Sequence, residues 1–218
     1  MRIPTGLRDR LMEANGRLYT LSVDPGHRVY GEKLIMRGGG EWREWSVTRS
    51  KPAAYLAVGG SAFPIKRDSR LLYLGAASGT TASHFSDIVD QGTVHCLEFS
   101  ARSFRDLVRI CGRRGNMIPL MGDATRPESF AFAVGDVDIV YQDVAQKGQA
   151  TILADNMDAF NADRGMLAVK ARSEDVTASP RDVFAEAHRT LESRGFRVME
   201  CRPLDPHEKD HAMIVVER

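Results

Sequence analysis

Cysteine is scarce in this sequence, and its spacing is irregular. The three cysteines, Cys96, Cys111 and Cys201, are odd in number and form no C-x-x-C pair, which argues against a disulfide framework and a zinc knuckle. We expect them to be small core residues in a reducing compartment. The sequence also lacks an apolar N-terminal segment and any run of about 18 apolar residues. It therefore predicts a cytoplasmic protein without a membrane span.

An excess of charge of either sign is also missing. The 30 Lys and Arg residues nearly balance the 29 Asp and Glu residues, which leaves a formal net charge of +1. Proteins that hold nucleic acid unaided are usually strongly basic. If this chain acts on RNA, its composition predicts that another molecule helps to hold the RNA. The single Arg-Gly tract, at residues 37–40, is too short for a disordered RNA-binding segment and predicts a hairpin loop.

The length and hydrophobic content allow one substantial core. With 218 residues, 43% of them hydrophobic, the chain can form one main domain and a small appended lobe. Two β-prone runs, at residues 17–23 and 29–36, are separated by a turn signal and predict a small antiparallel β lobe over residues 1–49. A helix is predicted at residues 50–58, where Pro52 is tolerated only in the first turn.

From residue 69 onward, short apolar runs alternate with longer amphipathic segments, which is typical of parallel βαβ units. Strands are predicted at residues 71–74, 93–99, 117–120, 137–142, 165–170, 196–202 and 212–216. Helices are predicted at residues 81–89, 101–111, 149–160 and 180–194. The last connection is too short for a helical crossover, so the last two strands should form an antiparallel hairpin. Residues 50–218 are thus predicted to be an α/β domain with a doubly wound, mostly parallel seven-stranded sheet. Class I S-adenosylmethionine-dependent methyltransferases have this Rossmann-like arrangement.

The first predicted strand of this sheet runs into a loop of small residues that opens a helix. Such a loop lets a ligand approach the backbone and offers it free N–H groups at the helix N-terminus. Gly75 and Gly79 give the spacing G-x-x-x-G, whereas the dinucleotide fingerprint is G-x-G-x-x-G. The loop therefore favours a nucleoside without a pyrophosphate, such as S-adenosylmethionine. Tight packing between strand and helix is the alternative explanation.

Acidic residues follow the next three predicted strands. Glu98 comes about 20 residues after Gly75, where an acid can bind ribose hydroxyls. Asp123, after the third strand, can meet the exocyclic amine of adenine, and Asp143 follows the fourth strand. Each acid alone is more often a turn residue or helix cap. Because ligands of open α/β sheets bind at the carboxyl ends of the strands, their coincidence with the glycine loop predicts a binding site there.

Eight segments of the chain resemble fibrillarin and its archaeal counterparts. In chain order they are VYGEKLI (29–35), RSK (49–51), LYLGAASGTTASHFSDIV (72–89), LEFS (97–100), GDAT (122–125), DVAQ (143–146), VKARS (169–173) and EKDHA (208–212). The resemblance covers nearly the whole chain in the right order. It is more specific than a general methyltransferase pattern. Fibrillarins with a long Gly/Arg-rich extension are eukaryotic, so its absence here favours an archaeal-type, cytoplasmic protein.

The resemblance implies an enzyme that uses S-adenosyl-L-methionine to methylate ribose 2′-hydroxyls of rRNA and tRNA. It implies a cofactor site formed by Gly75, Ala76, Thr80, Thr81, Glu98, Phe99, Asp123, Ala124, Asp143, Val144, Ala145 and Gln146. It also implies a catalytic set formed by Lys51, Asp143, Lys170 and His211. The implied partners are a box C/D guide RNA, a Nop-type scaffold protein and a kink-turn-binding protein.

The catalytic set has a plausible division of roles. A ribose hydroxyl is a poor nucleophile until it shares or loses its proton, and the methyl donor must be held in line with it. We expect Lys170 to orient the hydroxyl and help to deprotonate it, and Asp143 to fix that lysine. His211 would complete the polar network. A protein glutamine methyltransferase and a non-catalytic subunit of the same particle are the alternatives that the resemblance leaves open.

Three features do not fit this interpretation. His207 and His211 satisfy the zinc-protease pattern H-E-x-x-H, which needs a helix to place both imidazoles on one face. Nearby prolines and the strand that follows argue against that helix, so we expect no metal site. Gln142 occupies a position that is often acidic in the family, and Pro52 stands where a helix former is more usual.

Overall fold

A computed structural model describes residues 3–218 of the chain. Near the N-terminus, the 3-10 turn η1 (Thr5–Leu7) is followed by β1 (Leu11–Ala14), β2 (Arg17–Leu21), β3 (Leu34–Arg37) and β4 (Gly40–Trp45). These strands form an antiparallel sheet with the order β1-β2-β4-β3. Gly38 and Gly39, both with positive φ, make the turn between β3 and β4, so the predicted hairpin loop is confirmed.

The predicted strand at residues 29–36 is wrong in its first half. Only Leu34–Arg37 is extended, because the chain before it turns around the buried Glu32. The Glu32 carboxylate accepts backbone N–H groups from Val29 at 3.0 Å and from Tyr30 at 2.9 Å. A segment whose N–H groups bind a side chain in this way cannot donate them to a neighbouring strand.

The central sheet carries the rest of the chain. Its strands are β5 (Arg70–Leu74), β6 (Thr93–Glu98), β7 (Met117–Met121), β8 (Ile139–Gln142), β9 (Arg164–Lys170), β10 (Arg197–Pro203) and β11 (His211–Glu217). Their order in the seven-stranded sheet is β10-β11-β9-β8-β5-β6-β7, and β11 is antiparallel to both of its neighbours. The predicted mostly parallel sheet with a closing antiparallel hairpin is confirmed.

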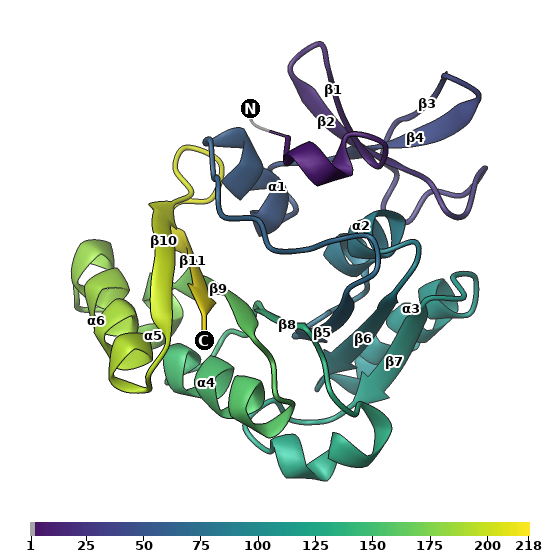
Figure 1. The fold of residues 1–218 in the computed structure, drawn as a ribbon. Coiled ribbons are helices and arrows are strands. Elements are labelled where there is room, and N and C mark those ends of the chain that lie inside the picture. Colours follow the sequence, from purple (N-terminus) through teal and green to yellow (C-terminus); the bar gives the residue numbers. More distant parts are fainter. Residues whose placement is uncertain (1–2) are drawn as a thin grey trace.

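Helices cover both faces of the sheet (Figure 1). They are α1 (Lys51–Ala57), α2 (Thr80–Ile88), α3 (Ala101–Cys111), α4 (Gln149–Ala159), α5 (Ala171–Glu174) and α6 (Pro180–Ser193), and short 3-10 turns lie at Pro127–Ser129 and Ala131–Ala133. Alternate strand residues face opposite cores. Leu71 and Tyr73 pack with α1, α2 and α3, whereas Leu72 and Leu74 pack with α4 and α6. Among residues 3–218, no helix combines the length and apolar character that a bilayer crossing requires.

A buried ionic network fastens the small sheet to α2. The fully buried carboxylate of Asp87 accepts hydrogen bonds from Arg43 at 2.7 Å, Arg114 at 2.8 Å and Thr20 at 2.6 Å. Arg43, itself fully buried, also pairs with Glu32 at 2.6 Å. A buried charge is strongly destabilising unless it is paired and fully hydrogen-bonded. The small sheet is therefore held in one position relative to α2.

His84 of α2 lies inside the same interface. Its Nδ1 is 2.8 Å from the Thr20 hydroxyl, its Nε2 is 2.9 Å from the Tyr30 hydroxyl, and its ring stacks on Trp45. Burial, helped by the charges of Arg43 and Arg114, lowers the pKa of His84 well below its ordinary value. The ring is neutral at neutral pH and completes a packed contact between the two sheets.

Candidate active site

The loop from β5 to α2 approaches the end of β8 very closely. Gly75, at the end of β5, has a φ of +85°, and a Cβ added to it would lie 2.9 Å from the carbonyl oxygen of Asp143. Glycine alone avoids both the strain and the collision. Gly79, with a φ of +92°, is the residue that directly precedes α2. The small residues thus serve both a close backbone approach and the entry into a helix.

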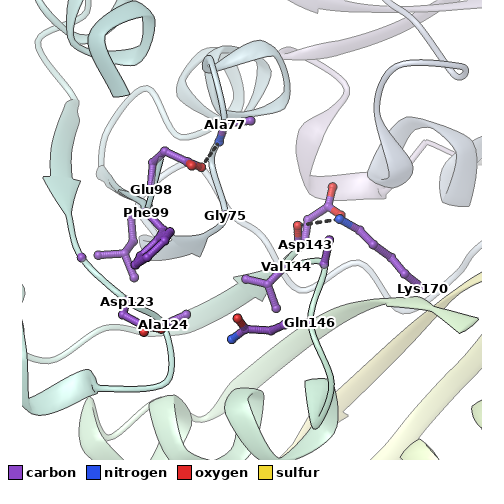
Figure 2. Close-up of a pocket in the computed structure, with 13 residues that line it drawn as sticks. Gly75, Ala77, Glu98, Phe99, Asp123, Ala124, Asp143, Val144, Gln146 and Lys170 are labelled. Atoms are coloured by element: carbon purple, nitrogen blue, oxygen red, sulfur yellow. Dashed lines mark hydrogen bonds and ion pairs between the residues drawn. The ribbon is translucent and has the colours of Figure 1, made fainter. Parts of the chain in front are cut away.

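A cavity of about 320 Å³ opens at the carboxyl ends of the parallel strands (Figure 2). Such positions are the usual ligand sites of open α/β sheets. Its lining comes from the ends of five strands and from the loops that follow them. The lining residues are Gly75, Ala77, Leu97, Glu98, Phe99, Gly122, Asp123, Ala124, Asp143, Val144, Ala145, Gln146 and Lys170.

Two carboxylates that accept backbone N–H groups and one exposed aromatic ring line one side of the cavity. Glu98 accepts the backbone N–H of Ala77 at 2.8 Å through one oxygen and that of Ser100 at 2.7 Å through the other. Asp123 accepts the N–H of Thr125 at 2.9 Å. Phe99 is 72% exposed, so a face of its ring is available for stacking. Fixed acids beside an uncovered aromatic ring suit the hydroxyls and base of a nucleoside.

Three predicted cofactor residues do not line this cavity. Ala76 is buried, and Thr80 and Thr81 begin α2 beyond the loop. The Thr81 hydroxyl donates to the Ser50 hydroxyl at 3.0 Å and thus ties α2 to the start of α1. Ala77, Leu97 and Gly122 line the cavity and were not predicted. Apart from its place in the small-residue loop, the sequence offers no signal for Ala77, which acts through its backbone N–H.

Asp143 and Lys170 line the other side of the cavity and form an ion cluster with Lys51, which is not a lining residue. Asp143 follows β8, Lys170 ends β9, and Lys51 begins α1. The Lys170 Nζ lies 2.8 Å from Oδ1 of Asp143, and the Lys51 Nζ lies 3.1 Å from the same oxygen. All three side chains are between 13% and 17% exposed. Three residues far apart in the sequence therefore form one partly shielded ion cluster, part of which Figure 2 shows.

The hydrogen bonds within this cluster leave one carboxylate oxygen of Asp143 without a hydrogen-bond donor among residues 3–218. Lys170 donates to the carbonyl oxygen of Asp143 at 2.9 Å, and Lys51 donates to Oδ2 of Asp143 at 3.1 Å. The buried Oδ1 of Asp143 receives no well-directed hydrogen bond from residues 3–218, although both ammonium groups attract it. A buried carboxylate oxygen normally has such a partner. Here the two positive charges compensate this oxygen instead.

His211 reaches the same end of the sheet from β11. It is the register partner of Lys170 across the antiparallel ladder, so the two side chains leave the sheet on the same face. Its Nδ1 lies 2.7 Å from the carbonyl oxygen of Lys209. Because a carbonyl oxygen only accepts, Nδ1 carries a hydrogen and donates it to Lys209.

The H-E-x-x-H segment does not form the helix that a zinc protease requires. Glu208 lies in the turn between β10 and β11, and His211 begins a strand. Without a helical repeat, His207 and His211 are not placed on one helical face. Across residues 3–218, no group of three or more His, Cys, Asp or Glu side chains has an arrangement suited to a metal ion.

Comparison with known proteins identifies first the class and then the family. The fold is that of class I methyltransferases: the precorrin-6y C5,15-methyltransferase of Geobacter metallireducens superposes with a TM-score of 0.52 at 15% identity, covering 71% of this chain and 84% of that one. A family model described as Fibrillarin matches residues 9–218. This chain belongs to the fibrillarin family.

Close relatives carry the name fibrillarin-like rRNA/tRNA 2′-O-methyltransferase. The protein of Methanopyrus kandleri is 48% identical over 91% of this chain and 87% of its own length. That of Methanothermobacter thermautotrophicus is 48% identical over 96% and 95%. Aeropyrum pernix fibrillarin, solved with natively bound S-adenosyl-L-methionine, is 42% identical over 94% and 92%, with a TM-score of 0.85. The fibrillarin of a fibrillarin/Nop5p complex is 39% identical over 96% and 97%, with a TM-score of 0.87.

Proposed function

We propose that this chain is an S-adenosyl-L-methionine-dependent methyltransferase that methylates ribose 2′-hydroxyls in rRNA and tRNA. The names of its relatives support this activity. The observation that carries the proposal is the Lys51–Asp143–Lys170 cluster at one side of a cavity whose other side has the groups that bind a nucleoside. A methyl donor and a ribose can meet between them.

The cavity suits S-adenosyl-L-methionine. Glu98 would bind the ribose hydroxyls of the cofactor, Asp123 would accept from the adenine amine, and Phe99 would cover the base. The backbone of Asp143 and of residues 144–146 closes the opposite wall. When bound there, the cofactor supplies an electrophilic methyl group on its sulfonium. The natively bound cofactor of the Aeropyrum pernix relative is consistent with this assignment.

The ion cluster would orient and activate the ribose hydroxyl. An ammonium group has three N–H donors, and Lys170 directs one of them at the carbonyl oxygen of Asp143, while its charge lies 2.8 Å from the carboxylate. Another of its N–H groups would hold the 2′-oxygen, which is the orienting role expected of Lys170. The Asp143 carboxylate would accept the hydroxyl hydrogen, and both lysines would stabilise the negative charge that grows on the ribose oxygen. The Nε2 atom of His211 would complete the polar network.

A guide RNA and partner proteins would select the target nucleotide. The formal net charge of +1 gives the chain little grip on RNA by itself. One relative has been solved in complex with Nop5p, which supports a Nop-type scaffold as partner. A box C/D guide RNA and a kink-turn-binding protein would complete the particle.

A reconstituted particle tests the proposal. The chain is assembled with scaffold, kink-turn-binding protein and one of two guide RNAs, then given isotopically labelled cofactor and one target RNA that pairs with both guides at different sites. We expect the label to move with the guide to the paired ribose. Label on a glutamine side chain would favour a protein methyltransferase. A particle without label in any macromolecule would favour a non-catalytic subunit, and guide-independent RNA labelling would contradict the guide's role.

A further inference from the structure

Lys170 lies at the end of β9, beyond the point where the neighbouring strand β8 stops. The ladder between β8 and β9 ends at the pair Gln142 and Leu167, whereas β9 continues to Lys170. On its other side, β9 stays paired with β11 up to Lys170 and His211. The main-chain groups of Lys170 that face away from β11 therefore lie beyond the last residue of β8. The partly buried N–H and C=O groups of Lys170 therefore need hydrogen-bond partners other than β8.

The side chain of Gln149 supplies those partners. Its Oε1 accepts the N–H of Lys170 at 2.9 Å, and its Nε2 donates to the carbonyl oxygen of Lys170 at 3.1 Å. Gln149 is only 1% exposed, so neither bond competes with bulk water. A planar amide presents a donor and an acceptor as a peptide group does. The Gln149 side chain thus makes the hydrogen bonds that a residue of β8 would make if that strand continued beside Lys170.

Two neighbours hold Gln149 in place, Glu174 at its side-chain amide and Gln142 at its main chain. The Glu174 carboxylate accepts the Gln149 Nε2 at 2.8 Å and the N–H of Gly148 at 2.7 Å. The Gln142 Nε2 donates to the carbonyl oxygen of Gln149 at 2.7 Å. An ionised acid at position 142 would have no hydrogen to donate, so this link depends on the amide of Gln142. Gln142 directly precedes Asp143, and the chain of amides therefore joins Asp143 to Lys170.

We propose that Gln149 is a positioning residue that fixes the Lys170 ammonium against Asp143 by clamping the Lys170 backbone from the side where β8 ends. The inference rests on the proposed methyl transfer. Geometry at a reacting centre is demanding, because a misplacement of about 1 Å can cost about 100-fold in rate. The Gln149 side chain binds the backbone of Lys170 and does not line the cofactor cavity. A substitution of Gln149 should therefore change the affinity for the cofactor only slightly.

A double-mutant cycle tests this role in the reconstituted particle. Gln149→Met keeps the length of the side chain and removes both bonds to Lys170. We expect its single-turnover methylation rate to fall at least about 10-fold, while the dissociation constant for S-adenosyl-L-methionine changes less than about threefold. In a Lys170→Ala background, Gln149→Met should lower the remaining rate less than about twofold, because residues that act as a unit are not additive.

A matched control separates positioning from general loss of structure. Asn116 is a half-buried amide that donates to the carbonyl oxygens of Ser86 and Val89 near the start of β7. Asn116→Ala should lower the melting temperature and leave the single-turnover rate of folded protein within about twofold. If Gln149→Met does not fold, Glu174→Ala removes the anchor of Gln149 instead and should lower the rate about threefold to 10-fold.

Two results would overturn the inference. One is a wild-type rate in a folded Gln149→Met or Glu174→Ala particle. The other is an equal fold-loss on Gln149→Met with and without Lys170, which indicates a general structural effect. Both require an active wild-type particle, so an inactive wild type would count against the proposed function and would be distinguishable from either result.

Discussion

Replacing Asp143 with asparagine removes the charge that holds two lysines together and changes the shape of the side chain very little. Its carboxylate lies 2.8 Å from the Lys170 ammonium and 3.1 Å from the Lys51 ammonium. At an effective dielectric constant of about 20, each contact is worth about 5 to 6 kcal/mol before desolvation is subtracted. The asparagine variant loses both attractions and leaves two cations facing each other.

The Asp143→Asn substitution should lower the rate of methyl transfer much more than it lowers the stability of the fold. Both lysine side chains are partly exposed and can turn toward water, so we expect Asp143→Asn to lower the free energy of unfolding by only about 1 to 3 kcal/mol. The ribose hydroxyl loses its acceptor and the ordered ammonium of Lys170. Loss of such proton-transfer assistance usually lowers a rate about 100-fold to 10,000-fold. We expect a loss in that range.

Single-turnover methylation in the reconstituted particle measures this loss, and calorimetric titration with S-adenosyl-L-methionine shows whether the variant still binds cofactor. Asp138→Asn is the matched control, because Asp138 directly precedes β8 and pairs with Arg70 at 2.7 Å at the exposed, opposite end of these strands. It should change the rate less than about twofold, since exposed ion pairs contribute about 0 to 1 kcal/mol. A folded, cofactor-binding Asp143→Asn particle that reacts within about threefold of wild type would refute the role assigned to Asp143.

Three further substitutions probe the cofactor side and the interface between the sheets. Glu98→Gln should weaken S-adenosyl-L-methionine binding about 10-fold or more, because bonds to a charged acceptor contribute about 1.5 to 3 kcal/mol; calorimetric titration measures this, and an unchanged affinity would remove Glu98 from the site. Gly75→Ala places a Cβ 2.9 Å from the Asp143 carbonyl oxygen at a φ of +85°, so both melting temperature and cofactor affinity should fall. Normal values for both would contradict the packing described. His84 stays neutral in the folded state while the unfolded chain takes up a proton below about pH 6.5, so stability should fall as the pH drops, by up to about 1.4 kcal/mol per pH unit. His84→Gln should reduce that slope in denaturant titrations between pH 6.5 and 5, and an identical slope would show that His84 titrates normally.

Periodic apolar segments made most of the fold predictable. The central strands and the helix at Ala101–Cys111 stand out because short apolar runs and amphipathic repeats match the periods of strand and helix. β1 and β4 were missed because charged residues interrupt them. Arg43 in β4 is fully buried, and only its pairing with Asp87 and Glu32 makes that possible. Pairing across such distances in the chain leaves no local pattern.

The candidate site was predictable where it depends on strand ends and less so where it depends on side-chain direction. Glu98, Asp123 and Asp143 were expected at the carboxyl ends of parallel strands, and the structure brings them to one cavity. Thr81 lies next to the loop, but it is the second residue of α2, and there its hydroxyl points to Ser50 and away from the cavity. The contact of Gln149 with the Lys170 backbone has no sequence signal, because a glutamine at the start of a helix is usually a solvated residue.

Methylation of a target RNA that carries one 2′-deoxyribose at the guided nucleotide shows whether the ribose 2′-oxygen receives the methyl group. The particle, the guide and every other nucleotide stay the same, and labelled cofactor reports each methyl transfer. We expect stoichiometric labelling of the all-ribose target at the paired nucleotide and loss of that label in the deoxy target. Equal labelling of both targets would contradict the proposed function, because the methyl group would then be going to an atom other than the ribose 2′-oxygen.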